Sequence, residues 1–367
     1  MVSPPHAPPT SLIAPTTRCN QPRAVTLVAD VTSLDRMAFI RLALTGRQLI
    51  PAAVNDLTQA HRTSTRRQYE SGWKKFQTFV TEKKVTVMTP QVLASFATSL
   101  FHSNHKVSPA TVTNAMVAIR DPVSFGFGVK IDDREWDLLK ASFFRQRPPP
   151  MPKPPNWSLR KVLDLLQSTR FQHNPSTTDS LHRAVFLVSL ATGHRVSQMA
   201  ALLRSPSFTK FGPGDSSVTL ASRPGFLAKN ERANHRIKPV VIHAWMEGDR
   251  HHPLCPVRAL RVYLDATSNT NRVEMWLDPK STRPLTAATL ATEIVRVILL
   301  ADPLSNPRAH QVRKFSSSLA FFRSFDVEAV REAGQWSSPI TFVRRYLLHH
   351  LTDSPCVTMG FFPTGTP

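Results

Sequence analysis

Six side chains in the second half of the chain are of the types that can carry out chemistry on a phosphodiester. Arginine offers a planar fork of donors for two oxygens of one phosphate, and tryptophan offers a single N–H donor. Lysine and histidine can exchange protons, and a tyrosine hydroxyl can attack phosphorus. In chain order these residues are Arg195, Lys229, His310, Arg313, Trp336 and Tyr346.

The local sequence around each of these residues suggests how it is presented. Arg195 follows a Thr-Gly pair in "ATGHRVSQMA", which indicates a turn that aims the start of the next helix. Lys229 falls at an expected hairpin tip in "GFLAKNERAN". His310 and Arg313 are three residues apart and share a helix face. Taken singly, each would more often be an ordinary surface residue.

Tyr346 is the best candidate nucleophile among only three tyrosines. Tyr69 belongs to an apolar stripe, and Tyr263 lies on the apolar side of the helix "PVRALRVYLDA", where we expect it in the core. Tyr346 has basic neighbours, Arg344 and Arg345, which are more plausible as contacts to a DNA backbone than as catalysts.

Helices are expected to position most of these residues. The first 24 residues are rich in proline and expected to be disordered, with one or two short helices following within residues 34–57. From 58 to 144 the pattern is helical, and Tyr69, Trp73, Phe76 and Val80 form an apolar stripe. The opposite face is basic and could be either solvated or in contact with phosphates; it carries Arg62, Arg66, Arg67, Lys74 and Lys75.

A proline-rich linker over 145–157 is expected to separate this helical domain from a larger one over 158–350. In the larger domain, helices alternate with a small antiparallel sheet expected over 217–243, including the "GFLAKN" segment. Residues 1–57 are an N-terminal extension, and residues 351–367 form a C-terminal tail that could either fray or dock on a neighbouring copy. The fold class is therefore mainly α with one small sheet.

The formal net charge of +21 favours a polyanionic partner, and nucleic acid in particular. The three cysteines lie far apart, so neither a disulfide framework nor a zinc site is indicated. We also find no carboxylate cluster for a divalent metal, and we expect no cofactor. The apolar run "AVFLVSLA" is too short to cross a bilayer, so we expect an intracellular protein with no membrane partner.

The ordered set of six residues resembles the catalytic pattern of the tyrosine recombinase (phage integrase) family, Arg, Lys, His-x-x-Arg, His or Trp, and Tyr. "LATGHRVSQMAAL" is similar to the first box of the family, "HQVRKFSSSLA" to the second, and "AGQWSSPITFVRRYL" to the third. The segments "FLAKN" and "WSSPITFVRRY" further resemble the recombinases of DIRS/Ngaro-type retrotransposons. The resemblance covers residues 58–348.

The resemblance implies a helical SAM-like core-binding domain and an α-rich catalytic domain. It also implies a site-specific recombinase or integrase that forms a 3′-phosphotyrosine without metal or ATP, as type IB topoisomerases do. The partners would be double-stranded DNA and three further copies of the chain in a tetramer. A retrotransposon origin would place the protein in the nucleus of a eukaryote.

Two departures from the family pattern leave alternatives open. Gln198 stands where the family has an acidic residue, and the interval from Trp336 to Tyr346 is one residue longer than the commonest spacing. The alternative is therefore a weak or inactive domesticated recombinase that acts as a DNA-binding protein. An RNA-coating protein is disfavoured, because the tryptophans mostly sit singly among apolar residues.

Overall fold

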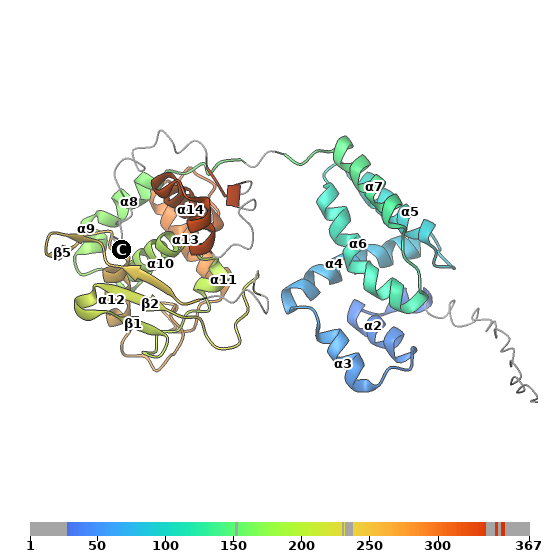
Figure 1. Cartoon of the computed structure of the whole chain (residues 1–367), viewed down its shortest axis with the longest axis horizontal. Helices are drawn as coiled ribbons and strands as arrows, with labels where there is room; N and C mark the ends of the chain where they lie inside the picture. The colour runs from blue at the N-terminus through green and yellow to red at the C-terminus, as the bar shows by residue number, and fades with distance from the viewer. Residues whose placement is uncertain are drawn as a thin grey trace, which may run out of the picture. The chain divides into compact units, whose positions relative to one another are not determined.

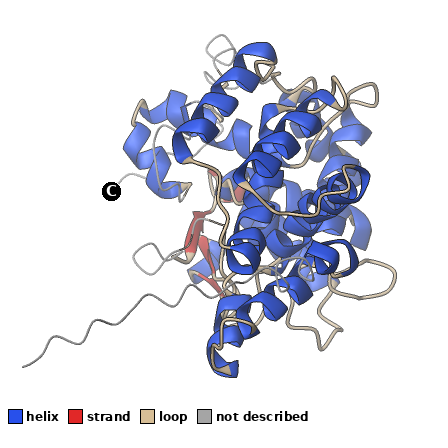
Figure 2. Cartoon of the chain, turned by 90° about the vertical axis from the view of Figure 1, so that its right-hand side faces the viewer, coloured by secondary structure: helices blue, strands red, loops and turns tan. Residues whose placement is uncertain are grey.

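The computed structural model describes residues 28–150, 153–229, 231, 238–334, 342–343 and 346–348. The chain divides into two compact units, Met1–Met151 and Pro152–Pro367, called unit 1 and unit 2 below. Both are built mainly from helices, and the few strands all lie in unit 2 (Figures 1 and 2). The expectation of a mainly α protein with a small antiparallel sheet is confirmed.

Unit 1 is wholly helical in its described part. Four of its helices follow polar caps, because the side chains of Asp35, Thr89, Ser108 and Asp132 accept hydrogen bonds from the first-turn N–H groups. The helices are α2 (Arg36–Thr45), α3 (Pro51–Gln59), α4 (Thr63–Glu82), α5 (Pro90–His102), α6 (Pro109–Phe127) and α7 (Asp133–Gln146).

The centre of unit 1 is the contact between α4 and α6. The predicted stripe on α4 is buried at Trp73, Phe76 and Val80, whereas Tyr69 is only half-buried. Gly72 lets the two helices approach closely, because a Cβ there would lie 2.7 Å from the Cβ of Ala118. The stripe therefore faces the core, as its spacing predicts.

Helix α6 contains a proline whose structural cost is offset by a distant arginine. Pro122 has no N–H and so leaves the carbonyl of Ala118, four residues earlier, without its helical donor. The Nε of Arg36, which is 1% exposed, donates to that carbonyl at 2.6 Å. Its Nη2 lies 3.4 Å from the carboxylate of Asp121. Arg36 thus supplies the hydrogen bond that the proline removes.

We expect Arg36→Met to destabilise unit 1 by roughly 1–3 kcal/mol, because it leaves the buried Ala118 carbonyl unpaired. The loss should be smaller in a Pro122→Ala background, where residue 122 regains an N–H for that carbonyl. Denaturant unfolding of the four proteins of this cycle measures the coupling.

A matched control for this cycle is Arg47→Met. Arg47 also donates to α6 carbonyls, at Ser124 and Phe125, but these contacts are exposed and water can replace them. Equal losses for Arg36→Met with and without Pro122 would contradict the compensation.

Unit 2 is organised around α10 (Thr177–Thr192), which is buried along almost its whole length from Asp179 to Thr192. It packs against α12, α13 and α14 (Figure 1). A helix that is apolar on all sides belongs in the centre of a domain, which explains the run "AVFLVSLA". The other helices are α8 (Leu159–Gln167), α9 (Thr169–Gln172), α11 (Val196–Met199), α12 (Pro256–Ala266), α13 (Ala287–Ala301), α14 (His310–Ser324) and α15 (Val327–Ala333).

A three-stranded antiparallel sheet in the order β1-β2-β3 joins β1 (Thr209–Phe211), β2 (Ser217–Leu220) and β3 (Val240–His243). Strands β2 and β3 of this sheet pair over four residues each, with Ser217 opposite His243 at one end and Leu220 opposite Val240 at the other. A separate ribbon pairs β4 (Met246–Glu247) with β5 (Arg250–His251). The expected strand character of "GFLAKN" is wrong for residues 225–229, where Gly225 has a φ of +74° and the chain turns.

The ends of the expected linker are held by their own units. In unit 1, Arg147 donates to the carbonyls of Phe101 at 2.8 Å and Val107 at 2.6 Å. In unit 2, the Trp157 indole is 4% exposed and donates to Gln311 Oε1 at 2.9 Å.

None of the described helices is both long and apolar enough to cross a bilayer.

Candidate active site

The turn before Arg195 depends on a glycine. Gly193 ends α10 with a φ of +58°, and a Cβ there would lie 3.0 Å from Ser316 Oγ on α14. Glycine is therefore required both for the left-handed backbone and for the close approach of α14. Arg195 then precedes α11, and its N–H donates to Gln198 Oε1 at 2.9 Å.

Gln198 is 1% exposed, and its side-chain oxygen caps the start of α11. A carboxylate at this position could accept the same hydrogen bond, so the amide keeps the backbone of Arg195 in a capped geometry. What the amide lacks is the negative charge beside the arginine.

Arg313 connects three parts of the candidate site. It lies in the first turn of α14, is 3% exposed, and donates from Nη1 to the carbonyl of Gly193. Its Nη2 donates to the carbonyl of Gly334 at 2.7 Å. The guanidinium carbon is 5.4 Å from the centre of the Tyr346 ring. One arginine therefore holds the end of α10 and the residue after α15 while it contacts the predicted nucleophile.

The charges around Arg313 favour an anion. Burial and, to a smaller extent, the positive charge of Arg195 lower the pKa of Arg313 to about 10, and the side chain of Tyr346 acts in the opposite direction. The positive charge of Arg195 thus disfavours the charged form of Arg313. A phosphate between the two side chains would offset this effect and accept hydrogen bonds from both.

His194 directly precedes Arg195 in the chain, and its side chain is only 8% exposed. Within the described part of the chain, neither ring nitrogen has a hydrogen-bond partner. Burial, Arg313 and Arg195 together lower the pKa of His194 to about 4, so the imidazole is neutral at pH 7.

We expect His194 to make the protein sensitive to acid. Its pKa of about 4 in the folded state is below the usual 6.5, so the unfolded state binds more protons in that interval. The stability is fully present above pH 6.5 and falls as the pH drops towards 4, by up to about 3 kcal/mol. Denaturant unfolding of the wild type and His194→Gln between pH 4 and 8 measures this loss.

His194→Gln should weaken the fall in the free energy of unfolding as the pH drops towards 4. His173→Gln is the control, since His173 is an exposed histidine of the same unit. An unchanged acid limb in His194→Gln would contradict the assignment.

The backbone around Tyr346 is fixed by α14. The hydroxyl of Ser318 donates to the carbonyl of Tyr346 at 3.0 Å and accepts from the N–H of Leu348 at 2.9 Å. The N–H of Tyr346 donates to the carbonyl of the buried Phe342 at 2.8 Å. The Tyr346 side chain itself is half-buried.

The structure brings Arg195, Arg313 and Tyr346 together, and it places His310 one turn before Arg313 on α14. The His310 side chain is accessible to solvent. Its pKa is lowered by the loss of part of its hydration and by the positive charges of Lys314 and Arg308. Lys229 is exposed in the connection between β2 and β3, and its ammonium makes no hydrogen bond to any described residue.

Three other predicted residues, Trp336, Arg344 and Arg345, lie outside the described residues. The basic residues predicted for unit 1 all lie on α4 or directly before it. Among them Arg66 is half-buried and donates from Nε to the carbonyl of His61 at 3.0 Å, whereas the others are exposed. The exposed residues are Arg62, Arg67, Lys74 and Lys75.

Two residues of the site, Ser318 and His194, were not predicted from the sequence. The three buried serines of α14, residues 316–318, were a usable signal, because serine is disfavoured in helix interiors and mostly exposed. His194 directly precedes Arg195, so its place in the motif was visible although its burial was not.

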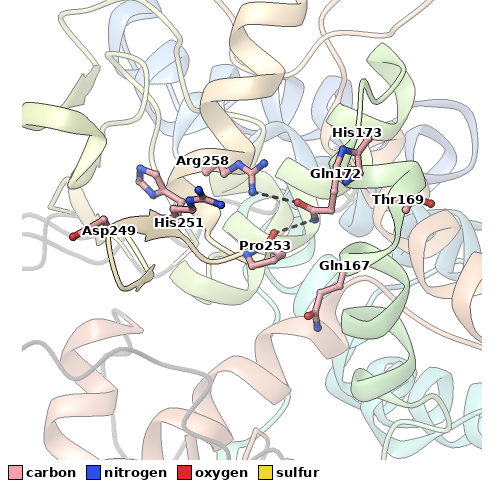
Figure 3. A pocket seen from close by; sticks show the side chains of 9 residues that line it. Gln167, Thr169, Gln172, His173, Asp249, His251, Pro253 and Arg258 are labelled. Carbon is pink, nitrogen blue, oxygen red and sulfur yellow. Dashed lines mark hydrogen bonds between the residues drawn. The ribbon is translucent and has the colours of Figure 1, made fainter.

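A separate hollow of about 700 Å³ in unit 2 includes none of the predicted residues (Figure 3). Gln172 lies in it between Arg258, which donates to its Oε1 at 3.3 Å, and the Pro253 carbonyl, to which it donates at 3.2 Å. Gln172 lies five residues before the start of α10, whereas Gly193 follows the end of this helix, whose 16 residues are about 24 Å long. The hollow is therefore distinct from the site around Arg313.

Among the described residues there is no group of three or more His, Cys, Asp or Glu side chains that could hold a metal ion.

Comparison with known proteins identifies the fold. No family model and no curated protein sequence matches the chain. The XerH site-specific recombinase bound to difH substrate has a TM-score of 0.57 and 15% identity, covering 88% of this chain and 94% of its own. The Tn1549 transposon integrase in complex with circular intermediate DNA has a TM-score of 0.51 and 12% identity, covering 89% and 99%. The chain therefore has the fold of the tyrosine recombinases and integrases.

Proposed function

We propose that this protein is a site-specific DNA recombinase that breaks and rejoins strands through a 3′-phosphotyrosine at Tyr346. The observation that carries the proposal is the contact of the Arg313 guanidinium with the Tyr346 ring at 5.4 Å, next to Arg195. A nucleophile held beside two phosphate-binding groups is what phosphoryl transfer requires. The fold shared with DNA-bound XerH and Tn1549 integrase supports DNA as the substrate.

In this mechanism Arg195 and Arg313 hold the non-bridging oxygens of the scissile phosphate, where negative charge develops. The hydroxyl oxygen of Tyr346 attacks phosphorus, and His310 accepts its proton. Partial burial, Lys314 and Arg308 lower the pKa of His310 and so favour the neutral ring, which can accept a proton.

The bond from phosphorus to the 5′-oxygen then breaks, and Lys229 protonates the leaving oxygen. Trp336 adds a hydrogen bond to a phosphate oxygen. A 5′-hydroxyl from the partner strand then attacks the phosphotyrosine and releases Tyr346. The energy of the phosphodiester bond is kept, so neither ATP nor a metal takes part in these steps.

The exposed basic residues of α4 are proposed to contact DNA phosphates, together with Arg344 and Arg345. Exchange between two sites requires several copies, so we propose a tetramer on DNA. The finer assignment is a recombinase of a DIRS/Ngaro-type element, which would act in a nucleus. Gln198 accepts the backbone N–H of Arg195 as a carboxylate could, so its presence does not by itself favour a DNA-binding protein without activity.

A selection from random sequence tests the proposal without a known target site. The full chain is incubated with a pool of nicked duplexes whose central sequence is randomised, so that the short cleaved strand is lost and the reaction is trapped. We expect a protein–DNA adduct that survives denaturant, and mass spectrometry should place the nucleotide remnant on Tyr346. Binding to the pool with no adduct would favour the DNA-binding alternative, and a remnant on another residue would exclude Tyr346.

A further inference from the structure

The hydroxyl of Ser318 makes contacts that are unusual for a serine within a helix. A helical serine ordinarily bonds to a carbonyl of its own helix, as Ser317 does to Arg313 O at 2.8 Å. Ser318 instead directs its hydroxyl to a different segment of the chain. It donates to the carbonyl of Tyr346 and accepts from the N–H of Leu348, at 3.0 and 2.9 Å.

The contact with Leu348 is buried, and the contact with Tyr346 is part-buried. Ser318 is fully buried at 0% exposure, and Leu348 is 5% exposed within the core of unit 2. Water therefore has little access to replace the serine hydroxyl if it is removed. The two backbone groups enclose the peptide units that directly follow Tyr346, so they fix the backbone from which the phenol ring projects.

The same helix carries the phosphate-binding group. Ser318 is five residues after Arg313 on α14, and an α-helix is rigid over such a distance of about 7.5 Å. Arg313 defines where the phosphate would bind, and Ser318 defines where the tyrosine backbone lies. One rigid element thus sets the distance between the electrophile and the nucleophile.

We infer that Ser318 is a positioning residue for Tyr346, and that it keeps the phenol oxygen in line with the phosphate held by Arg313. This inference rests on the proposed function of Tyr346 as the nucleophile. Misplacing a reacting atom by about 1 Å can cost about 10² in rate. Ser318 should therefore affect the chemical step and leave DNA binding unchanged.

Three substitutions separate positioning from general stability. Ser318→Ala removes the hydroxyl, and Ser318→Thr keeps it. The matched control is Ser317→Ala, because Ser317 is also buried but bonds only within its own helix, to Arg313 and Lys314 carbonyls. A merely structural role would make Ser317→Ala and Ser318→Ala behave alike once their stabilities are compared.

Fluorine NMR of fluorotyrosine-labelled protein reports the position of Tyr346 without any DNA. The chain has three tyrosines, and Tyr346→Phe identifies the signal of Tyr346. We expect Ser318→Ala to shift or broaden this signal alone, with Ser318→Thr and Ser317→Ala close to the wild type. An unchanged Tyr346 signal in Ser318→Ala would overturn the inference.

Single-turnover adduct formation at saturating DNA then tests the catalytic consequence. We expect Ser318→Ala to slow this step by about 10-fold to 10²-fold with unchanged DNA affinity, and Ser318→Thr to restore it. Equal rates in Ser318→Ala and the wild type would overturn the role in catalysis. If the NMR signal responds but the wild type forms no adduct on any DNA, the contact stands and the proposed function fails.

Discussion

Tyr346→Phe is expected to abolish the covalent protein–DNA adduct completely while the protein still binds DNA. The substitution removes one oxygen atom, and that oxygen is the only atom that forms the bond to phosphorus in the proposed reaction. The ring remains, so its contact with the Arg313 guanidinium is retained. The measurement is denaturing gel analysis of adducts on trapped substrates, with DNA affinity determined in parallel.

The two other tyrosines provide controls of the same chemical change. Tyr69→Phe alters a half-buried residue of unit 1, whereas the candidate site is built from residues of unit 2. Tyr263→Phe removes a hydroxyl that accepts from the N–H of Leu277 at 2.8 Å, so it should lower stability but leave adduct formation intact. A persistent adduct in Tyr346→Phe would rule out this residue as the nucleophile.

Arg313→Lys is expected to lower the rate of adduct formation by about 10²–10³-fold, the usual cost of losing a donor to the developing charge. A lysine keeps one positive charge, but it cannot contact the carbonyls of Gly193 and Gly334 and a phosphate with the planar geometry of an arginine. The measurement is the single-turnover rate at saturating DNA, together with the free energy of unfolding.

A second arginine, the half-buried Arg204, separates the catalytic loss from a loss of fold. Arg204 also bonds to several carbonyls of unit 2, including those of Thr267 and Glu274, but it lies among loop residues outside the site. Arg204→Lys should lower stability without lowering the rate of the folded protein. Equal rate losses in both variants would show that Arg313 acts only through the fold.

Local patterns in the sequence predicted the helices well, because apolar spacing depends on neighbours within a few residues. The stripe of Trp73, Phe76 and Val80 was predicted in this way, as was a small antiparallel sheet within residues 217–243, to which β2 and β3 belong. The turn at residues 225–229 was missed, because its alternating apolar pattern also fits a strand.

The contacts that fix the site could not be read from the sequence, because they join residues far apart in the chain. Arg313 meets Gly193 across 120 residues, and Ser318 meets Tyr346 across 28. The order of residue types indicated the chemistry, whereas the distances among Arg195, Arg313 and Tyr346 required the fold. The roles of Lys229 and Trp336 remain predictions.

The hydrogen-bonded ends of the proline-rich segment define how many residues connect the two units. Because Arg147 is bonded to unit 1 and Trp157 is buried in unit 2, only the residues between them form a tether. Ten peptide units can span at most about 36 Å, which is the longest distance that can separate these two anchor points. The length of this tether sets the effective concentration of one unit near a ligand that is bound to the other. Insertions between 148 and 156 would lower this concentration without altering either core.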